Sequence, residues 1–286
     1  MKAKVFLVKA FTKDKNAGNP AGVVFDADSL DYEQMLNISK KLGFSESVFI
    51  SKSNKADFKL RFFSVKEEVD LCGHATIAAF YALVKKGKID FGNRFKKILT
   101  QETNLGILNV ECDKSGFITM EQKVPEFHVI ESDRGKISRL LNIKVDDLGN
   151  YPIQSVSTGA HKLIVSIKSL EILLKIKPDF DSIISYCKEK STRGLYLFTF
   201  DTLENGDFHT RQFSPLIGIN EDPITGIAGG ALGAYAVKHS LLGKTDFVIE
   251  QGYIMSKFGR IYVKVINNLI RVGGYACIYG EIKFEI

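Results

Sequence analysis

One local pattern occurs twice in this chain, and the repeat restricts the folds that the chain can adopt. The pattern Arg-x-Phe-Ser begins at Arg61 and again at Arg211. In each copy a glycine follows and opens a run of small residues, Gly73 in the first copy and Gly226 in the second. Two copies on this scale predict two similar folded halves, since a solenoid would need three or more repeats.

The two glycine-opened runs predict helices whose first turns are suited to binding an anion. Free backbone N–H groups and the positive end of the helix dipole favour negative charge at a helix start. If Gly73 and Gly226 face one cleft between the halves, that cleft is the expected place for a small carboxylate. The alternative is that the glycines only permit tight turns, and spacing alone does not decide between the two.

Composition predicts a globular protein with two domains. The chain has 286 residues, of which 45% are hydrophobic and 25% charged, close to the averages of globular proteins. We expect a first half over residues 1–123, completed by a C-terminal strand over 274–286, and a second half over 124–273. No apolar stretch reaches 18 residues, so we expect no membrane span. The N-terminus lacks the layout of a signal peptide, and we expect a cytoplasmic location.

Charge, cysteines and histidines exclude several function classes. The net charge is +6, but the lysines are scattered and no basic stripe with aromatic partners predicts nucleic-acid binding. The four cysteines form no Cys-x-x-Cys pair, which argues against a zinc ribbon and a disulfide framework. The five histidines are also dispersed along the sequence. We therefore predict no metal.

The periodicity predicts an α+β fold. Short strand-like runs surround one small-residue helix in each half, over 75–86 and 227–239. Glycine costs about 1 kcal/mol in a helix interior, so the glycines of the second helix require close packing. We expect two pseudo-symmetric halves, each a curled, mostly antiparallel sheet around a central helix. A further helix is expected over 31–42, capped by Asp28 or Ser29 and ended by Gly43.

Three residues are candidates for acid/base chemistry. Glu46 stands between apolar neighbours at the start of a strand, where burial would raise its pKa and allow proton transfer near neutral pH. His74 follows Gly73 at a helix start, and Asp222 precedes the second helix. The competing interpretations are a surface glutamate, a buried capping histidine and a helix-capping aspartate.

Cys72 supports a different hypothesis. A thiol at a helix N-terminus has a lowered pKa and can abstract a proton, as a two-base racemase requires. The matching position in the second half is Thr225, and no cysteine lies near it in the sequence. A small packed residue is therefore the simpler interpretation of Cys72.

Taken together, several segments resemble the PhzF-like family, named after the isomerase of phenazine biosynthesis. The most specific runs from Val69 to Thr76, with the sequence VDLCGHAT. The others begin at Lys9 (KAFT), Gly18 (GNPA), Phe44 (FSES) and Glu221 (EDPITG). Their order and spacing fit the family over nearly the whole chain.

This resemblance implies a fold like that of diaminopimelate epimerase and, commonly, a homodimer. It also implies cofactor-free isomerisation, in which a glutamate takes a proton from one carbon and returns one to another along an allylic system. Carried over, Glu46 is that acid/base, while His74 and Asp222 orient the substrate and assist proton handling. The amides at Gly73 and around Gly226 would hold a carboxylate, and Asn19 would help to shape the site.

One position departs from the family pattern. Where the family usually has serine after Thr-Gly, this chain has Ile227, so a hydroxyl donor is replaced by an apolar group while the backbone N–H remains. Three functions stay open: an isomerase of small cyclic or amino-bearing unsaturated carboxylates, a cysteine-assisted racemase or epimerase of an amino acid, and a non-catalytic carboxylate-binding protein. The retained Glu46, His74 and Asp222 favour the isomerase.

Overall fold

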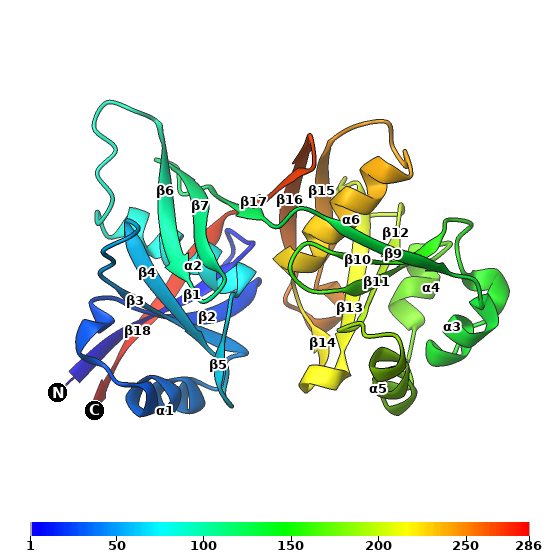
Figure 1. Cartoon of the computed structure of the whole chain (residues 1–286), viewed down its shortest axis with the longest axis horizontal. Helices are drawn as coiled ribbons and strands as arrows, with labels where there is room; N and C mark the ends of the chain where they lie inside the picture. The colour runs from blue at the N-terminus through cyan, green and yellow to red at the C-terminus, as the bar shows by residue number, and fades with distance from the viewer. Residues whose placement is uncertain (1, 286) are drawn as a thin grey trace. The chain divides into compact units, whose positions relative to one another are not determined.

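The computed structural model describes residues 2–285, and the chain divides into two compact units. Unit 1 contains the chain up to Glu121 and again from Gly273 onward. Unit 2 runs from Gln122 to Val272. The last strand, β18 (Ala276–Glu285), pairs antiparallel with the first, β1 (Lys2–Ala10), so both ends of the chain belong to unit 1 (Figure 1).

Unit 1 is a sheet wrapped around one central helix. After β1 its elements are, in chain order, β2 (Asn19–Val24), a 3-10 turn (Ala27–Ser29), α1 (Tyr32–Leu42), β3 (Glu46–Ser51), β4 (Phe58–Phe63), β5 (Glu68–Val69), α2 (Gly73–Lys85), β6 (Lys96–Thr103), β7 (Gly106–Asp113) and β8 (Ile118–Gln122). The central helix is α2, which contacts β1, β2 and β3, and also β7 and β18.

Unit 2 repeats this plan around helix α6, which contacts β10, β11, β15 and β16. It adds three helices, α3 to α5, that cover a second apolar core around Ile137, Leu173 and Ile183. Its elements are β9 (Glu126–Glu131), α3 (Arg134–Leu140), a 3-10 turn (Val145–Asp147), β10 (Ile153–Ser157), β11 (Lys162–Ser166), α4 (Leu170–Lys175), α5 (Phe180–Glu189), β12 (Leu195–Thr199), β13 (Phe208–Ser214), a 3-10 turn (Pro215–Ile217), β14 (Ile219–Asp222), α6 (Gly226–Lys238), β15 (Asp246–Gln251), a 3-10 turn (Tyr253–Met255), β16 (Gly259–Ile266) and β17 (Leu269–Gly274).

The strand pairings of the two units match. In unit 1, β4 pairs antiparallel with β5 and parallel with β6. In unit 2, β13 pairs antiparallel with β14 and parallel with β15. The parallel pair β2–β3 likewise corresponds to β11–β12. The predicted α+β fold of two similar halves, each with a curled and mostly antiparallel sheet around a central helix, is confirmed.

The repeated arginines have the same structural role in both units. Arg61 donates through Nε and Nη2 to both carboxylate oxygens of Glu68, at 2.9 and 2.7 Å. Arg211 binds Glu221 in the same two-pronged way, at 2.8 and 2.9 Å. Such fork-like pairs constrain geometry as well as charge. Each pair therefore holds the strand before the glycine-opened helix in place.

Glycine is unfavourable in a helix interior, and close packing explains the glycines of α6. A Cβ on Gly233 would lie 2.5 Å from Cγ1 of Val263, and one on Gly230 would overlap the side-chain amide of Gln122. Both neighbours belong to unit 2. The helix thus lies closer to its sheet than any helix with side chains at these positions.

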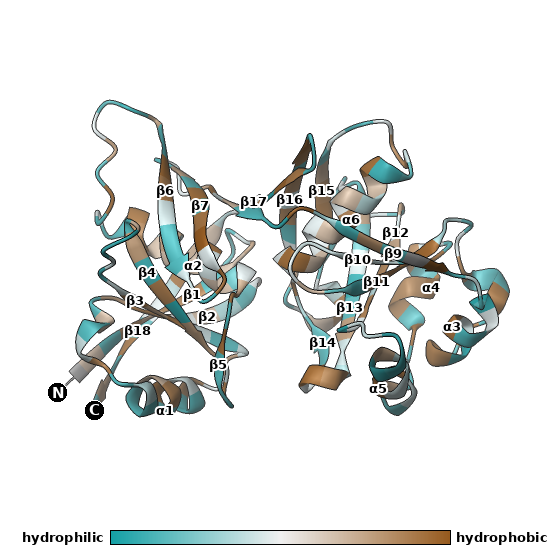
Figure 2. Cartoon of the chain, viewed as in Figure 1, coloured by the Kyte–Doolittle hydropathy of each residue, from teal (hydrophilic) through white to brown (hydrophobic). Residues whose placement is uncertain are grey.

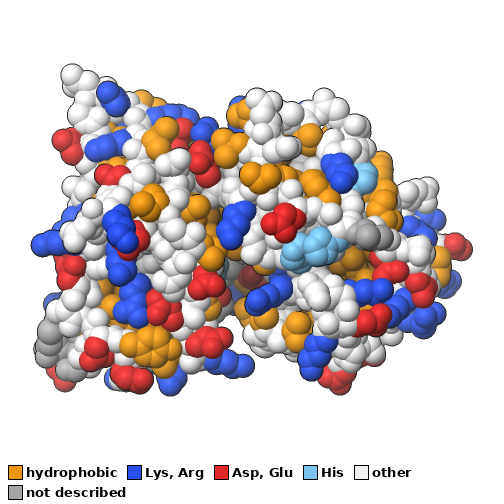
Figure 3. All heavy atoms as spheres, in the orientation of Figure 1, with side chains coloured by type: hydrophobic (Ala, Val, Ile, Leu, Met, Phe, Trp, Pro, Cys, Tyr) orange, Lys and Arg blue, Asp and Glu red, His pale blue; other side chains and the backbone are white. Residues whose placement is uncertain are grey.

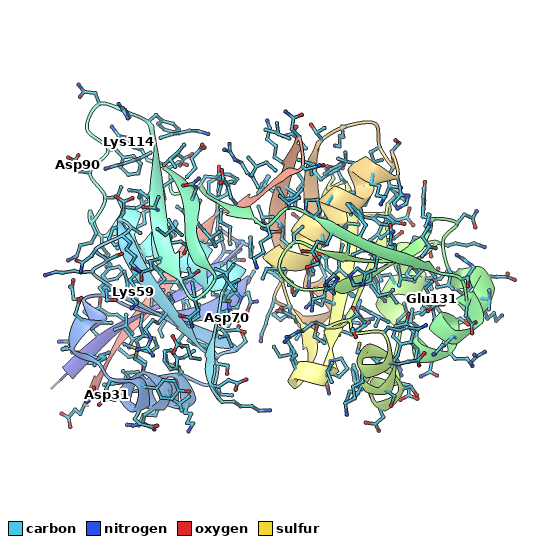
Figure 4. The ribbon with its side chains drawn as sticks, in the orientation of Figure 1. Asp31, Lys59, Asp70, Asp90, Lys114 and Glu131 are labelled. Atoms are coloured by element: carbon cyan, nitrogen blue, oxygen red, sulfur yellow. The ribbon has the colours of Figure 1, made fainter. Side chains whose placement is uncertain are left out.

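Helix α1 begins at a different cap from the one expected. Asp31, not Asp28 or Ser29, is the N-cap residue: its carboxylate accepts from the Gln34 amide, and the Gln34 side chain accepts from the Asp31 amide, at 2.9 and 3.0 Å. This reciprocal capping box satisfies two amides at once, and Figure 4 shows Asp31 at the start of the helix. Hydrophilic and hydrophobic residues alternate along α1, as Figure 2 shows, consistent with a helix that buries one face.

Across residues 2–285, no helix combines the length and the apolar character that crossing a bilayer would require.

Candidate active site

The carboxyl group of Glu46 is largely buried at the first residue of β3. Its side chain is 18% exposed, and its strand neighbours Val48 and Phe49 are buried. Burial raises the pKa of the Glu46 carboxyl, while the nearby side chains of Ser45 and Cys72 oppose this shift. A carboxyl of this kind can accept and return a proton close to neutral pH.

His74 lies beside this carboxyl group. Its Nε2 atom is 3.6 Å from Oε2 of Glu46, and its Nδ1 atom is 3.3 Å from the sulfur of Cys72. The ring is only 5% exposed and stands in the first turn of α2. The structure therefore brings together Glu46, Cys72 and His74, two of which were predicted as catalytic residues and one as the base of an alternative mechanism.

The first turn of α2 supplies the free backbone N–H groups that the sequence predicted at Gly73. Cys72 is the N-cap residue and Gly73 is the first residue of the helix, which has no acidic side chain in its first turn. The positive end of the helix dipole thus lies beside the Glu46 carboxyl, within unit 1. Asn19 belongs to the same unit: it opens β2, the parallel neighbour of β3, and is 1% exposed.

In unit 2, Asp222 ends β14 just before α6. Its Oδ2 atom accepts from the Thr225 hydroxyl at 2.5 Å, and its backbone oxygen accepts from the Gln251 side chain at 2.9 Å. Thr225, not Asp222, is the N-cap of α6. The capping interpretation of Asp222 is therefore wrong. The carboxylate instead receives the hydroxyl of the cap residue.

Gly226 and Ile227 are the first two residues of α6. Their backbone oxygens are held within unit 2: Gly226 accepts from the Gln122 side chain at 3.0 Å, and Ile227 accepts from the Thr158 hydroxyl at 3.1 Å. The Ile227 side chain is half-buried. These contacts fix the first turn of α6, where Ile227 stands in place of the serine that the family pattern usually has.

Lys162, a charged residue of unit 2 that no sequence pattern singled out, is 4% exposed. Its ammonium group donates to Oγ of Ser214 at 2.8 Å and to the backbone oxygen of Arg193 at 3.2 Å. Burial lowers the pKa of Lys162 to about 8, while the negative charge of Asp222 opposes the shift. The available signal was a lysine at the head of the apolar run from Leu163 to Val165.

Unit 1 also contains a set of atoms with which a metal ion could be held. One donor atom each from Glu46, Cys72 and His74 lies within 4.8 Å of the others. Oxygen, sulfur and nitrogen donors are all ligands that zinc accepts. The same three groups suit proton transfer without a metal, because a carboxyl, an imidazole and a thiol are common acids and bases.

Comparison with known proteins identifies the family of the chain. The family model described as phenazine biosynthesis-like protein, PhzC-PhzF, matches residues 8–281. The chain belongs to this family. The chain is 40% identical over 278 residues to an uncharacterized isomerase of Clostridium acetobutylicum and 38% identical over 269 residues to one of Bacillus subtilis. Each alignment covers 92% of this chain and 90% of the relative.

Solved structures place the fold in the same family. A PhzF-family phenazine biosynthesis protein of Bacillus anthracis superposes with a TM-score of 0.90 at 33% identity and full coverage of both chains. A hydroxyproline epimerase of Agrobacterium vitis superposes with a TM-score of 0.65 at 12% identity, over 99% of this chain and 92% of that one, which shows a shared fold alone. This PhzF-family chain is thus an isomerase with an epimerase-like fold.

Proposed function

We propose that this PhzF-family protein isomerises a small cyclic or amino-bearing unsaturated carboxylate without a cofactor, with Glu46 as the proton carrier. The observation that carries the proposal is the buried Glu46 carboxyl, whose raised pKa comes from desolvation. In the reaction, the Glu46 carboxylate takes a proton from one substrate carbon. The electron pair of the broken C–H bond shifts along the allylic system, and the protonated Glu46 returns a proton to the other end.

The burial of Glu46 suits both the removal of the proton and its return. An ionised carboxylate in apolar surroundings is a stronger base than one in water, because the neutral form is favoured there. The imidazole of His74 lies 3.6 Å from Oε2 of Glu46, and the side chains of Ser45 and Cys72 also contact this carboxyl. We assign His74 the role of orienting the substrate's polar groups and assisting proton handling.

Binding of the substrate carboxylate is assigned to backbone amides. Gly73 opens α2 and Gly226 opens α6, and helix starts favour anions. Asp222 is proposed to orient an amino or hydroxyl group of the same substrate, and Asn19 to shape the pocket in unit 1. Ile227, which replaces a hydroxyl donor, favours a substrate that is less polar at this point.

The first test is deuterium wash-in. The protein is incubated in heavy water with a panel of small cyclic and amino-bearing carboxylates, and each ligand is analysed for deuterium and for conversion to an isomer. We expect exchange or conversion of at least one ligand by the wild type and neither by Glu46→Gln. Glu33→Gln, on the exposed first turn of α1, is the matched control and should behave as the wild type.

The opposite results are equally informative. If ligands bind but no member of the panel exchanges or isomerises, the non-catalytic binding protein becomes the better description. If Glu46→Gln retains exchange, the proton carrier has been assigned to the wrong residue.

One observation favours a second candidate, a racemase or epimerase that uses Cys72. The sulfur of Cys72 is 3.3 Å from Nδ1 of His74, close enough for the imidazole to take the thiol proton. At the matching N-cap of α6 stands Thr225, so a second thiol is missing. Loss of exchange in Cys72→Ser together with activity in Glu46→Gln would favour this candidate.

The family resemblance also leads us to propose a cytoplasmic homodimer. Light scattering of the purified protein tests the dimer: a mass near twice 31.9 kDa would support it, and a mass near one chain would contradict it.

A further inference from the structure

A second group of metal-binding side chains lies in unit 2, apart from the residues assigned to catalysis. Donor atoms of Glu126, His128 and His161 all lie within 4.8 Å of one another. Nε2 of His161 is 3.7 Å from Oε2 of Glu126, and the two imidazole centroids are 3.9 Å apart. In Figure 3 histidine side chains gather on the visible face over the region of β9 to β11.

The sheet explains why these three side chains meet. Glu126 and His128 are two residues apart on β9 (Glu126–Glu131), so their side chains share one face of the strand. Glu126 pairs with Ser157 of β10, and the chain then turns back through His161 into β11. Figure 4 labels Glu131 at the far end of β9 from this group.

The backbone at His161 is held in place without its side chain. Its carbonyl oxygen accepts from the Arg193 amide at 2.8 Å and from the Thr192 hydroxyl at 3.0 Å. Nδ1 of His161 is buried and has no hydrogen-bond partner among the described residues. Nε2 of the same ring faces the Glu126 carboxylate, and a neutral ring that carries its proton on Nδ1 presents Nε2 as a ligand on this side.

The kinds of donor atom also suit a metal. Two imidazoles and one carboxylate match the three-ligand sets of zinc sites that keep a water in the fourth position.

We propose that Glu126, His128 and His161 form a binding site for a first-row transition-metal ion of the zinc type. Imidazole donors favour such ions over Mg²⁺ and Ca²⁺, which prefer all-oxygen ligands. The ligand atoms are spread somewhat wider than in a closed site. Glu126 is 69% exposed at its side chain and is therefore free to close on the ion. A bound ion would join β9 to the turn between β10 and β11.

The test must separate this site from Glu46, Cys72 and His74, which also place donor atoms together. We would titrate Zn²⁺ by calorimetry into the double variant Cys72→Ser/His74→Gln, with any purification tag removed. We expect one equivalent of Zn²⁺ to bind. Glu126→Gln, His128→Gln and His161→Gln, each in this background, should weaken binding by at least about tenfold, the lower range for losing even an outer-shell partner.

A matched control and a second measurement keep the result clear. His239→Gln removes a histidine of unit 2 whose Nε2 lies 3.0 Å from Oε1 of Gln154, and it should leave binding unchanged. In the protein that keeps Cys72 and His74, Co²⁺ absorption distinguishes the two sites. Of the two, only the site with Cys72 gives the intense thiolate charge-transfer band. Absence of Zn²⁺ binding in the double variant, or binding that all three substitutions leave intact, would overturn the proposal.

Discussion

The two units share one scaffold, but each buries a different charged side chain in its parallel strand pair. Unit 1 buries Glu46 and unit 2 buries Lys162. The repeat aligns Phe63 of β4 with Phe213 of β13. In unit 1, Phe63 pairs with Ser47, the residue after Glu46. In unit 2, Phe213 pairs with Leu195, the residue after Gly194. Gly194 therefore occupies the position of the proposed proton carrier.

The strand paired with this position differs in the opposite sense: the uncharged residue is in unit 1 and the charged residue is in unit 2. Ala21 of β2 pairs with Glu46, and the register of β11 with β12 places Lys162 next to Gly194 in the same way. A side chain at Gly194 would collide with the backbone oxygen of Phe213 and with Ser214. Unit 2 thus has no room for a carboxylate at this position and holds a buried amine on the adjacent strand. The difference favours a reaction with one carboxylate base over a symmetric two-base reaction.

The largest expected effect comes from breaking this asymmetry at Glu46. Glu46→Gln keeps the shape but removes the proton carrier, so the rate of isomerisation should fall by about 10²- to 10⁴-fold, the usual contribution of a general acid/base. Asp222→Asn, which changes only a proposed orienting group, should cost less. Rates on the substrate found by deuterium wash-in measure both. If the two losses are equal, the proton carrier is not confined to unit 1.

The ion pairs of the repeat should differ in their contribution to stability. Arg211 is 5% exposed at its side chain, against 24% for Arg61, and donates in addition to the carbonyl oxygens of Leu173 and Ile176, both at 2.9 Å. Arg211→Met should lower the free energy of unfolding by about 3–5 kcal/mol, as expected for breaking a buried pair. Arg61→Met should cost about 1 kcal/mol or less.

Urea unfolding of both arginine variants measures this difference. Equal destabilisation would show that the carbonyl contacts of Arg211 add nothing, and that the two copies of the motif are equivalent in energy as well as in geometry.

The buried amine of unit 2 predicts a pH dependence. Because the pKa of Lys162 is lowered from 10.5 to about 8 in the folded state, the unfolded chain binds more protons between these values, and stability rises with pH across this window. Relative to Lys162→Met, the wild type should gain up to about 3 kcal/mol from pH 8 to 10.5. Unfolding at several pH values tests this. A constant difference between the two proteins would mean that the amine titrates normally.

The smallest expected effect concerns the central helices. The position of Gly233 in α6 corresponds to Phe80 in α2, and only α6 lies close enough to its sheet to exclude a Cβ there. Gly233→Ala should destabilise by about 1–2 kcal/mol, because overpacking outweighs the gain in helix propensity. Gly135→Ala in α3, where a Cβ would meet only side-chain atoms at 3.4 Å, should be neutral or stabilising. Thermal unfolding distinguishes them.

Much of the fold was accessible from the sequence because the signals are local. Alanine and glycine runs opened by Gly73 and Gly226 predicted the two central helices over 75–86 and 227–239, which the structure has as α2 and α6. Strands β9 and β10 were missed, since their role depends on pairing with each other and not on a strong pattern of their own. The cap of α1 was misplaced because three acidic or hydroxyl-bearing candidates precede that helix closely in the sequence.

The sequence by itself determined the repeat, the family and the residues around Glu46 and His74, because these are encoded in short contiguous motifs. Only the tertiary structure decided that Lys162 is buried at the position matching Ala21, and that His128 and His161 meet beside Glu126. Side chains that are far apart in sequence become neighbours through strand register. Register depends on the packing of the whole sheet, which no local pattern specifies.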